Sequence, residues 1–181
     1  SSIIGITVGT LCAQNSLASK FILAVCDTLQ TFPSFIYLIP VMMLFGVTDT
    51  SVLIAVIVYA TIPATRYTVE GLTSVPSSLQ DAGAMSGVNR LQRLLKIDLP
   101  MAFPHMMLGI NQTVIFSLFM VIIGAMIGTD DLGQYILKAL SDKQGIGNGI
   151  TLGLCVAFIG LTVDHLIRTW ANQRKKYMGI S

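Results

Sequence analysis

The sequence predicts an all-α integral membrane protein with about five transmembrane helices in a single domain, residues 1–181. Hydrophobic residues make up 53% of the chain, charged residues only 11%, and the mean hydropathy is +0.74. Soluble domains usually carry about 25% charged residues, so this chain has too few for a water-facing surface. Its long uncharged stretches also approach the about 20 apolar residues that a membrane-crossing helix needs.

The uncharged stretches place the expected helices at about 1–14, 22–47, 51–68, 105–128 and 147–169. The second contains Pro33 and Pro40, which should kink it. Asp27, near the start of this helix, is expected to pair with the backbone or a neighbouring arginine. Asp164 and Arg168, four residues apart in the last helix, are expected to pair with each other.

The chain opens inside an apolar segment, without a start Met, a basic region or a cleavage pattern of small residues. We therefore expect no signal peptide, and we expect further residues, with more membrane helices, upstream.

The distribution of basic residues predicts the orientation. Lys20, residues 66–96 and residues 168–176 together hold nine of the eleven Lys and Arg residues, whereas the opposite flanks hold only Lys138 and Lys143. The positive-inside rule assigns the first set to the cytoplasm. The acidic pair Asp130 and Asp131 would then lie outside.

The segment between the fourth and fifth predicted helices is too polar to cross a membrane. Its apolar residues recur at near-helical spacing, at Leu132, Ile136, Leu137 and Leu140. We expect a short external helix lying at the membrane interface, followed by a glycine-rich turn at 144–149.

Nothing in the sequence is typical of a self-sufficient enzyme. The three cysteines are isolated in apolar runs, the two histidines lie sixty positions apart, and no P-loop or zinc-protease pattern is present. The net charge of +2 is too small to indicate nucleic-acid binding. A membrane protein without its own catalytic set is therefore favoured.

A polar, basic insert interrupts the apolar pattern at 77–100, on the side assigned to the cytoplasm. Ser77 or Ser78 is a plausible N-cap for a short helix at 80–86. Gly87 should break that helix, and a second, basic helix is expected at 89–97. Pro100 should stop the second helix before the next span. On spacing alone, an amphipathic loop lying on the bilayer is an equal alternative.

The insert resembles the EAA motif, E-A-A-x3-G-x9-I-x-L-P, of ABC importer permease subunits. Asp81 stands in place of the Glu and Gly83 in place of the second Ala. Residues 27–46 and 110–137 are also similar to the glycine betaine/proline/choline branch of type I importer permeases. This resemblance implies the type I permease fold, with 77–100 as a coupling region that contacts an ATPase. The implied coupling residues are Asp81, Ala82, Gly83, Gly87, Ile97, Leu99 and Pro100.

The resemblance also implies partners and a location. ATP and Mg would be bound by a separate ATPase subunit, with no cofactor on this chain. An extracytoplasmic solute-binding protein would deliver glycine betaine or a related quaternary ammonium or compatible solute, and a second permease copy would complete the pathway. The chain would be a multi-pass protein of the inner membrane.

The translocation pathway is expected along the second and fourth predicted helices. Aromatic faces attract quaternary ammonium groups, although aromatic and Met side chains in membrane helices more often pack. Gly109, Gly124 and Gly128 are expected to allow close helix packing. The candidate pathway residues are Phe32, Phe35, Asn111, Thr113, Ser117 and Met120.

Two other functions stay open at this point. A permease of the same superfamily for another small solute, such as an amino acid, is poorly discriminated by sequence. An ion-coupled secondary transporter should have ionisable residues near mid-membrane and inverted repeats; the sequence shows neither.

Overall fold

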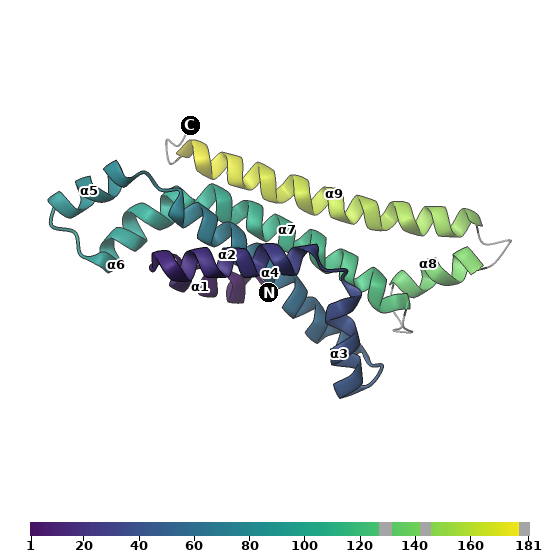
Figure 1. The fold of residues 1–181 in the computed structure, drawn as a ribbon. Helices are drawn as coiled ribbons and strands as arrows, with labels where there is room; N and C mark the ends of the chain where they lie inside the picture. The colour runs from purple at the N-terminus through teal and green to yellow at the C-terminus, as the bar shows by residue number, and fades with distance from the viewer. Residues whose placement is uncertain (127–131, 142–145, 178–181) are drawn as a thin grey trace.

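The computed structural model describes residues 1–126, 132–141 and 146–177, and these residues are mainly helical (Figure 1). Most of the helices run along one long direction, while α3 projects to the side and α5 and α6 extend beyond the others at one end. The helices are α1 (Ser2–Ala13), α2 (Ser16–Thr31), α3 (Phe35–Phe45), α4 (Asp49–Thr73), α5 (Ser77–Met85), α6 (Arg90–Arg93), the π-helical turn η1 (Leu94–Asp98), α7 (Leu99–Met126), α8 (Leu132–Ser141) and α9 (Ile146–Tyr177).

Helix α4 is the centre of the bundle, since it packs against α1, α2, α3 and α7. Close contact between α4 and α7 depends on two glycines of α7. A β-carbon at Gly109 would lie 2.9 Å from the Tyr67 Cβ, and one at Gly124 would lie 2.6 Å from the Val52 Cγ1. The packing expectation for these two glycines is confirmed; Gly128 lies outside the described residues.

Membrane-spanning stretches are present, as the sequence predicts. Within the described residues, three helical stretches are long and apolar enough to cross a membrane, namely Asp49–Thr73, Arg90–Ala125 and Gly147–Lys175, and the bent pair α2–α3 makes a fourth if its two helices form one span. Helix α1 is an apolar helix of 12 residues at the start of the given sequence. It packs against α4.

The predicted helix at 22–47 is two helices, α2 and α3, and the break between them lies at Pro33, one of the two prolines expected to kink it. α2 and α3 meet at an angle of 87°. Phe32 has extended backbone angles, φ −74° and ψ 138°, as expected for a residue that precedes a proline, because the Pro33 ring disfavours helical geometry there. Pro40, by contrast, lies within α3 without ending it.

Pro100 does not stop a helix, contrary to the expectation from the sequence. The chain runs through η1 directly into α7. The backbone N–H of Leu99 donates to the Leu94 carbonyl, five residues earlier, and this wider π-turn accommodates the ring of the following proline. The N-cap of α5 is Pro76 rather than Ser77 or Ser78, and α5 begins at Ser77, three residues before the predicted start.

The predicted interfacial helix after α7 is present as α8. The predicted glycine-rich turn falls partly on residues 142–145, which lie outside the described residues, and α9 begins at Ile146, next to the predicted helix start at 147. Asp130 and Asp131 also lie outside the described residues. Helices α4 and α9 extend past their predicted cytoplasmic ends, to Thr73 and Tyr177.

Candidate functional site

Helices α5 and α6 form a hairpin, residues 77–93, that projects from the basic end of the molecule (Figure 1). Gly87 makes the bend with φ +75°, a left-handed conformation that side chains other than Gly rarely adopt. Asn89 and Gln92 then form a capping box at the start of α6. The predicted break at Gly87 and the helix start at Asn89 are both confirmed.

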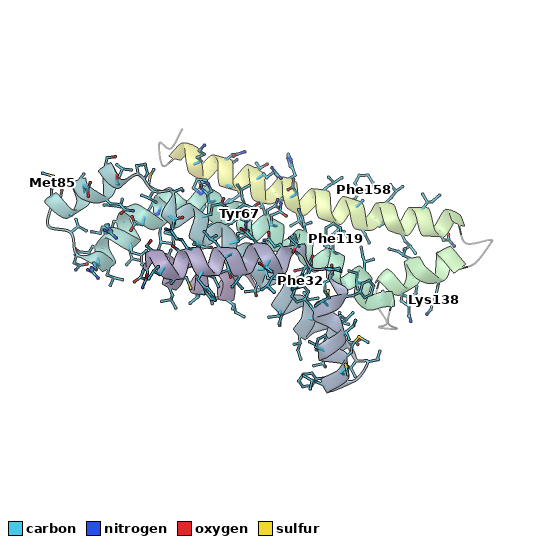
Figure 2. All side chains as sticks on the ribbon, in the orientation of Figure 1. Phe32, Tyr67, Met85, Phe119, Lys138 and Phe158 are labelled. Atoms are coloured by element: carbon cyan, nitrogen blue, oxygen red, sulfur yellow. The ribbon has the colours of Figure 1, made fainter. Side chains whose placement is uncertain are left out.

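The outer surface of this hairpin exposes apolar side chains to an unusual degree. Met85 is 91% exposed and projects at the far end of α5 (Figure 2). Asp81 and Ala82 are exposed on the same helix, and Leu91 and Leu95 are exposed after the bend. A small protruding surface of mixed apolar and charged character is suited to a protein partner.

The inner surface of the hairpin packs against η1. A β-carbon at Gly83 would lie 2.6 Å from the Ile97 Cδ1, so the glycine allows Ile97 to approach α5. The Val88 N–H also donates to the Gly83 carbonyl, at 3.3 Å. The departure from Ala at Gly83 thus has a local steric explanation.

Leu99 and Pro100 are partly buried at the base of the hairpin, next to Asp98. Asp98 is only 6% exposed and pairs with Arg93 at 3.3 Å. The ion pair ties α6 to the start of α7. The hairpin is thereby joined to α7, which is long enough to cross the membrane. A displacement of the hairpin would therefore be transmitted to α7.

A cavity of about 880 Å³ lies behind the hairpin at the same end. Its walls come from α1, α2, α4, α5, α6 and η1, and they include the cations Lys20, Arg90 and Arg93 but only one carboxylate, Asp98. The cavity is therefore a basic recess that opens where the positive-inside rule places the cytoplasm.

The six candidate pathway residues do not line one cavity. Phe32 and Phe35 flank the break between α2 and α3 and are each 40% exposed. Met120 is fully buried in the core cluster with Tyr59 and Leu38. These three residues therefore occupy two different environments, the open break and the packed core.

The polar candidates on α7 donate hydrogen bonds to their own helix or to α9. The Thr113 hydroxyl donates to the Gly109 carbonyl at 2.9 Å, and the Ser117 hydroxyl donates to the Thr113 carbonyl at 2.8 Å. Asn111 is 2% exposed, and its side-chain amide donates to Asp164 of α9 at 2.5 Å. In this conformation none of the three presents a free donor to a solute.

An aromatic stack was missed by the sequence reasoning. The Tyr59 ring lies 5.1 Å from the ring of Tyr37 and 4.9 Å from that of Phe116, centroid to centroid. The stack joins α3, α4 and α7 just inside the α2–α3 break, and the Ser34 hydroxyl lies 3.4 Å from that of Tyr59. No spacing in the sequence indicates that Tyr59 brings Tyr37 and Phe116 together.

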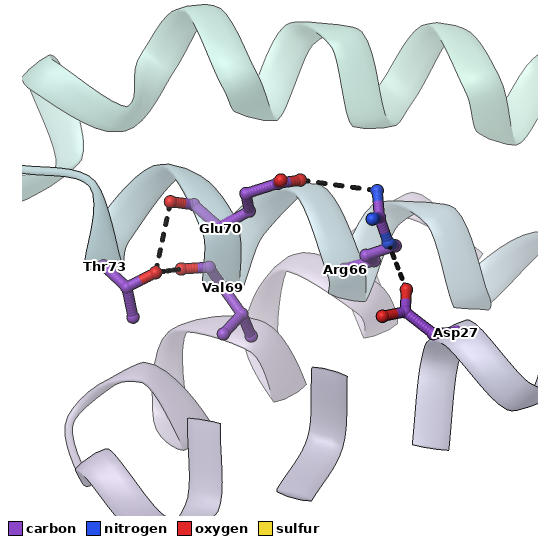
Figure 3. A network of polar contacts seen from close by, with 5 residues as sticks. All are labelled: Asp27, Arg66, Val69, Glu70 and Thr73. Atoms are coloured by element: carbon purple, nitrogen blue, oxygen red, sulfur yellow. Dashed lines mark hydrogen bonds and ion pairs between the residues drawn. The ribbon is translucent and has the colours of Figure 1, made fainter. Parts of the chain in front are cut away.

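Two ion pairs lie within the apolar helices, and both were predicted. Asp27 of α2 bonds Arg66 of α4 at 2.6 Å, and Arg66 also reaches Glu70 at 3.4 Å (Figure 3). Asp164 and Arg168 pair at 2.8 Å. Each charge of this group has an opposite charge beside it.

Comparison with known proteins gives one family and several relatives. The family model described as "Binding-protein-dependent transport system inner membrane component" matches residues 5–176. The chain is 75% identical over 180 residues to the trimethylamine N-oxide transport system permease protein TmoV of Pelagibacter ubique, covering 99% of this chain and 25% of that protein. It is 34% identical to the glycine betaine/proline betaine transport system permease protein ProW of Escherichia coli, covering 91% of this chain and 46% of that protein.

A solved structure has the same fold. The chain aligns with a chain of the MetNI methionine ABC transporter in an inward-facing conformation, with a TM-score of 0.69 and 19% identity, over 97% of this chain and 86% of the other. The chain spans only about a quarter of the length of TmoV and under half that of ProW.

Proposed function

Because the chain belongs to the family of binding-protein-dependent transport system inner membrane components, we propose that it forms the membrane passage of an ATP-driven importer. It has the type I importer permease fold, of the betaine and choline branch, and is a multi-pass protein of the inner membrane. The proposed solute is a methylated amine that serves as a compatible solute: trimethylamine N-oxide, glycine betaine or a related quaternary ammonium compound.

One observation carries the coupling part of the proposal: the α5–α6 hairpin at the basic end. It projects beyond the bundle with Met85 and Asp81 exposed, and the Arg93–Asp98 pair ties it to α7. We propose that an ATPase subunit holds this hairpin and moves it as a rigid body. ATP and Mg are bound and used on that partner, and this chain needs no cofactor of its own.

The solute class is supported by the relatives and by the aromatic side chains. TmoV and ProW are named for trimethylamine N-oxide and for glycine betaine and proline betaine. Their solutes share a nitrogen that carries positive charge and is covered by alkyl groups, which an aromatic face attracts. In this chain, Phe32 and Phe35 at the α2–α3 break are exposed enough to meet such a group.

The importer also needs partners. We propose an extracytoplasmic solute-binding protein that delivers the solute and a second permease copy that completes the passage. The cycle is alternating access, in which the nucleotide state of the ATPase biases the inward-facing or outward-facing conformation. Transport of another solute, such as an amino acid, is an alternative outcome of the test below.

The test is reconstitution of the full-length protein with its ATPase and binding protein in liposomes. Trimethylamine N-oxide, glycine betaine, choline and methionine are supplied in turn, and both ATP hydrolysis and uptake are measured. Stimulation and uptake with methylated amines but not with methionine support the proposal. Uptake without ATP, driven by an imposed proton or sodium gradient, would instead identify an ion-coupled transporter.

A further inference from the structure

A groove of about 190 Å³ lies between α7 and α9, close to the basic end and away from the α5–α6 hairpin. The side chains of Met107 and Leu108 contribute an apolar wall, and Ala171 leaves space on the opposite helix. Asn111, Arg168 and Lys175 add polar groups to the same lining. The groove therefore combines an apolar surface with cationic groups. An anionic phospholipid has the complementary composition, with apolar chains and a negatively charged headgroup.

The charges of the groove leave a net positive site. Arg168 is neutralised by Asp164, whose carboxylate oxygens lie 2.8 and 2.9 Å from its Nε. Among the residues that the structure describes, no carboxylate pairs with Lys175 within 4.0 Å. Among the described residues, the Lys175 ammonium group is therefore left without a carboxylate partner.

Asn111 adds an unpaired polar group to the lining of the groove. The residue is 2% exposed, and its Nδ2 donates to Asp164. Its Oδ1 is buried and accepts no hydrogen bond within the described part of the chain. A buried acceptor without a donor is costly, and this one belongs to the lining of the groove.

The depth of the groove fits the headgroup level of a membrane. Lys175 follows Arg168 by seven residues, or about 10 Å along α9. Between them, Trp170 contacts Phe103 edge-on at 5.7 Å and lies under the Arg174 guanidinium at 5.7 Å. Trp and basic side chains gather where a helix leaves the bilayer, so the groove runs from that interface into the apolar layer.

We infer that this groove binds the headgroup of an anionic phospholipid from the cytoplasmic leaflet. The phosphate lies between Lys175 and Arg168. An acyl chain runs along Met107 and Leu108. Basic pockets between membrane helices on the cytoplasmic side bind anionic headgroups by this chemistry.

Native mass spectrometry of the full-length protein in detergent tests the assignment, with phosphatidylglycerol and phosphatidylcholine titrated separately. We expect tighter binding of phosphatidylglycerol. Lys175→Gln should weaken that binding about fivefold, and Lys175→Arg should retain it. Lys20→Gln is the matched control, because it removes one positive charge at the same end but outside the groove.

A second variant tests the shape of the site without changing its charge. Ala171→Phe fills the groove and should also weaken phosphatidylglycerol binding, in protein that elutes as a single species in gel filtration. Equal affinity for the two lipids, or equal losses in Lys20→Gln and Lys175→Gln, would overturn the assignment. Displacement of the lipid by millimolar inorganic phosphate would also overturn the assignment, because the groove would then be a phosphate site. A change of oligomeric state in Ala171→Phe would overturn it as well, because the groove would then be a subunit interface.

Discussion

Asp27 and Arg66 join α2 to α4 through an ion pair in which the Arg66 Nε donates to the Asp27 Oδ1 at 2.6 Å (Figure 3). Arg66 also reaches Glu70 on its own helix at 3.4 Å. The pair links the first half of the bent α2–α3 unit to the central helix of the bundle. It therefore holds one side of the break against α4 while α3, on the other side, projects outward.

Replacing Asp27 with Asn should loosen α2 from α4. The side chains of the pair are partly exposed, so the expected loss is modest, about 1 kcal/mol and a few degrees in the unfolding temperature. Gel filtration of detergent-solubilised protein after heating measures it. Glu70→Gln, which removes only the longer contact within α4, should cost less; equal stability of Asp27→Asn and the unchanged protein would show that the pair contributes nothing.

A bulky residue at Gly87 should uncouple transport from ATP hydrolysis while insertion into the membrane stays intact. Because no atom lies within 4 Å of a β-carbon there, the cost of Gly87→Val is backbone strain, about 1–2 kcal/mol, and it falls on the bend of the hairpin. Gly87→Asn should be milder, since Asn tolerates positive φ. Solute-stimulated ATPase activity and uptake are measured together in the reconstituted transporter.

Gly46 offers a matched control for this variant. It has φ +77° and equally open surroundings, but it ends α3, which projects to the side of the bundle, away from the hairpin. Gly46→Val therefore imposes backbone strain at least as large without touching the hairpin. Coupling lost equally in both variants, or kept in Gly87→Val, would contradict the role of the hairpin.

The long apolar helices were predictable from the sequence, whereas the geometry of the junctions between helices was not. The long apolar stretches of α4 and α9 are recognisable because hydropathy alone defines them. Residues 28–48 are equally apolar, yet hydropathy does not distinguish a continuous span from two helices that meet at 87°. The Pro33 position gave the place of the break, but its size depends on the packing of α3 against α4.

The site was predictable only where its residues are close in sequence. The bend at Gly87 and the pairing of Asp164 with Arg168 follow from local rules. The Tyr37–Tyr59–Phe116 stack and the Asn111–Asp164 bond arise from tertiary contacts between separate helices. No spacing rule connects such residues, because the fold alone sets their distance.

Truncating Phe32 or Phe35 should alter transport more than assembly. Both rings are substantially exposed, so their removal should change folding stability by about 0.5 kcal/mol or less. If they meet the methylated amine, Phe32→Ala or Phe35→Ala should raise the KM for uptake severalfold, since a cation–π contact contributes about 0.5–1 kcal/mol at an exposed site. Phe45→Ala, at the far exposed end of α3, is the control, and unchanged uptake kinetics in the first two variants would make their rings packing residues.

A second carboxylate at position 111 should disrupt the contact between α7 and α9. Asn111 donates to Asp164 across this interface, so Asn111→Asp brings two like charges together at a buried position and should cost about 3 kcal/mol. Asn111→Leu loses one hydrogen bond without adding charge and should cost only about 1 kcal/mol. The double variant Asn111→Asp with Asp164→Asn restores a carboxylate–amide pair with the roles exchanged, and it should recover most of the lost unfolding temperature. If the double variant is no more stable than Asn111→Asp alone, the side chain of residue 111 does not face Asp164 in the membrane. The prediction that Asn111 lies along the translocation pathway would then better explain its position.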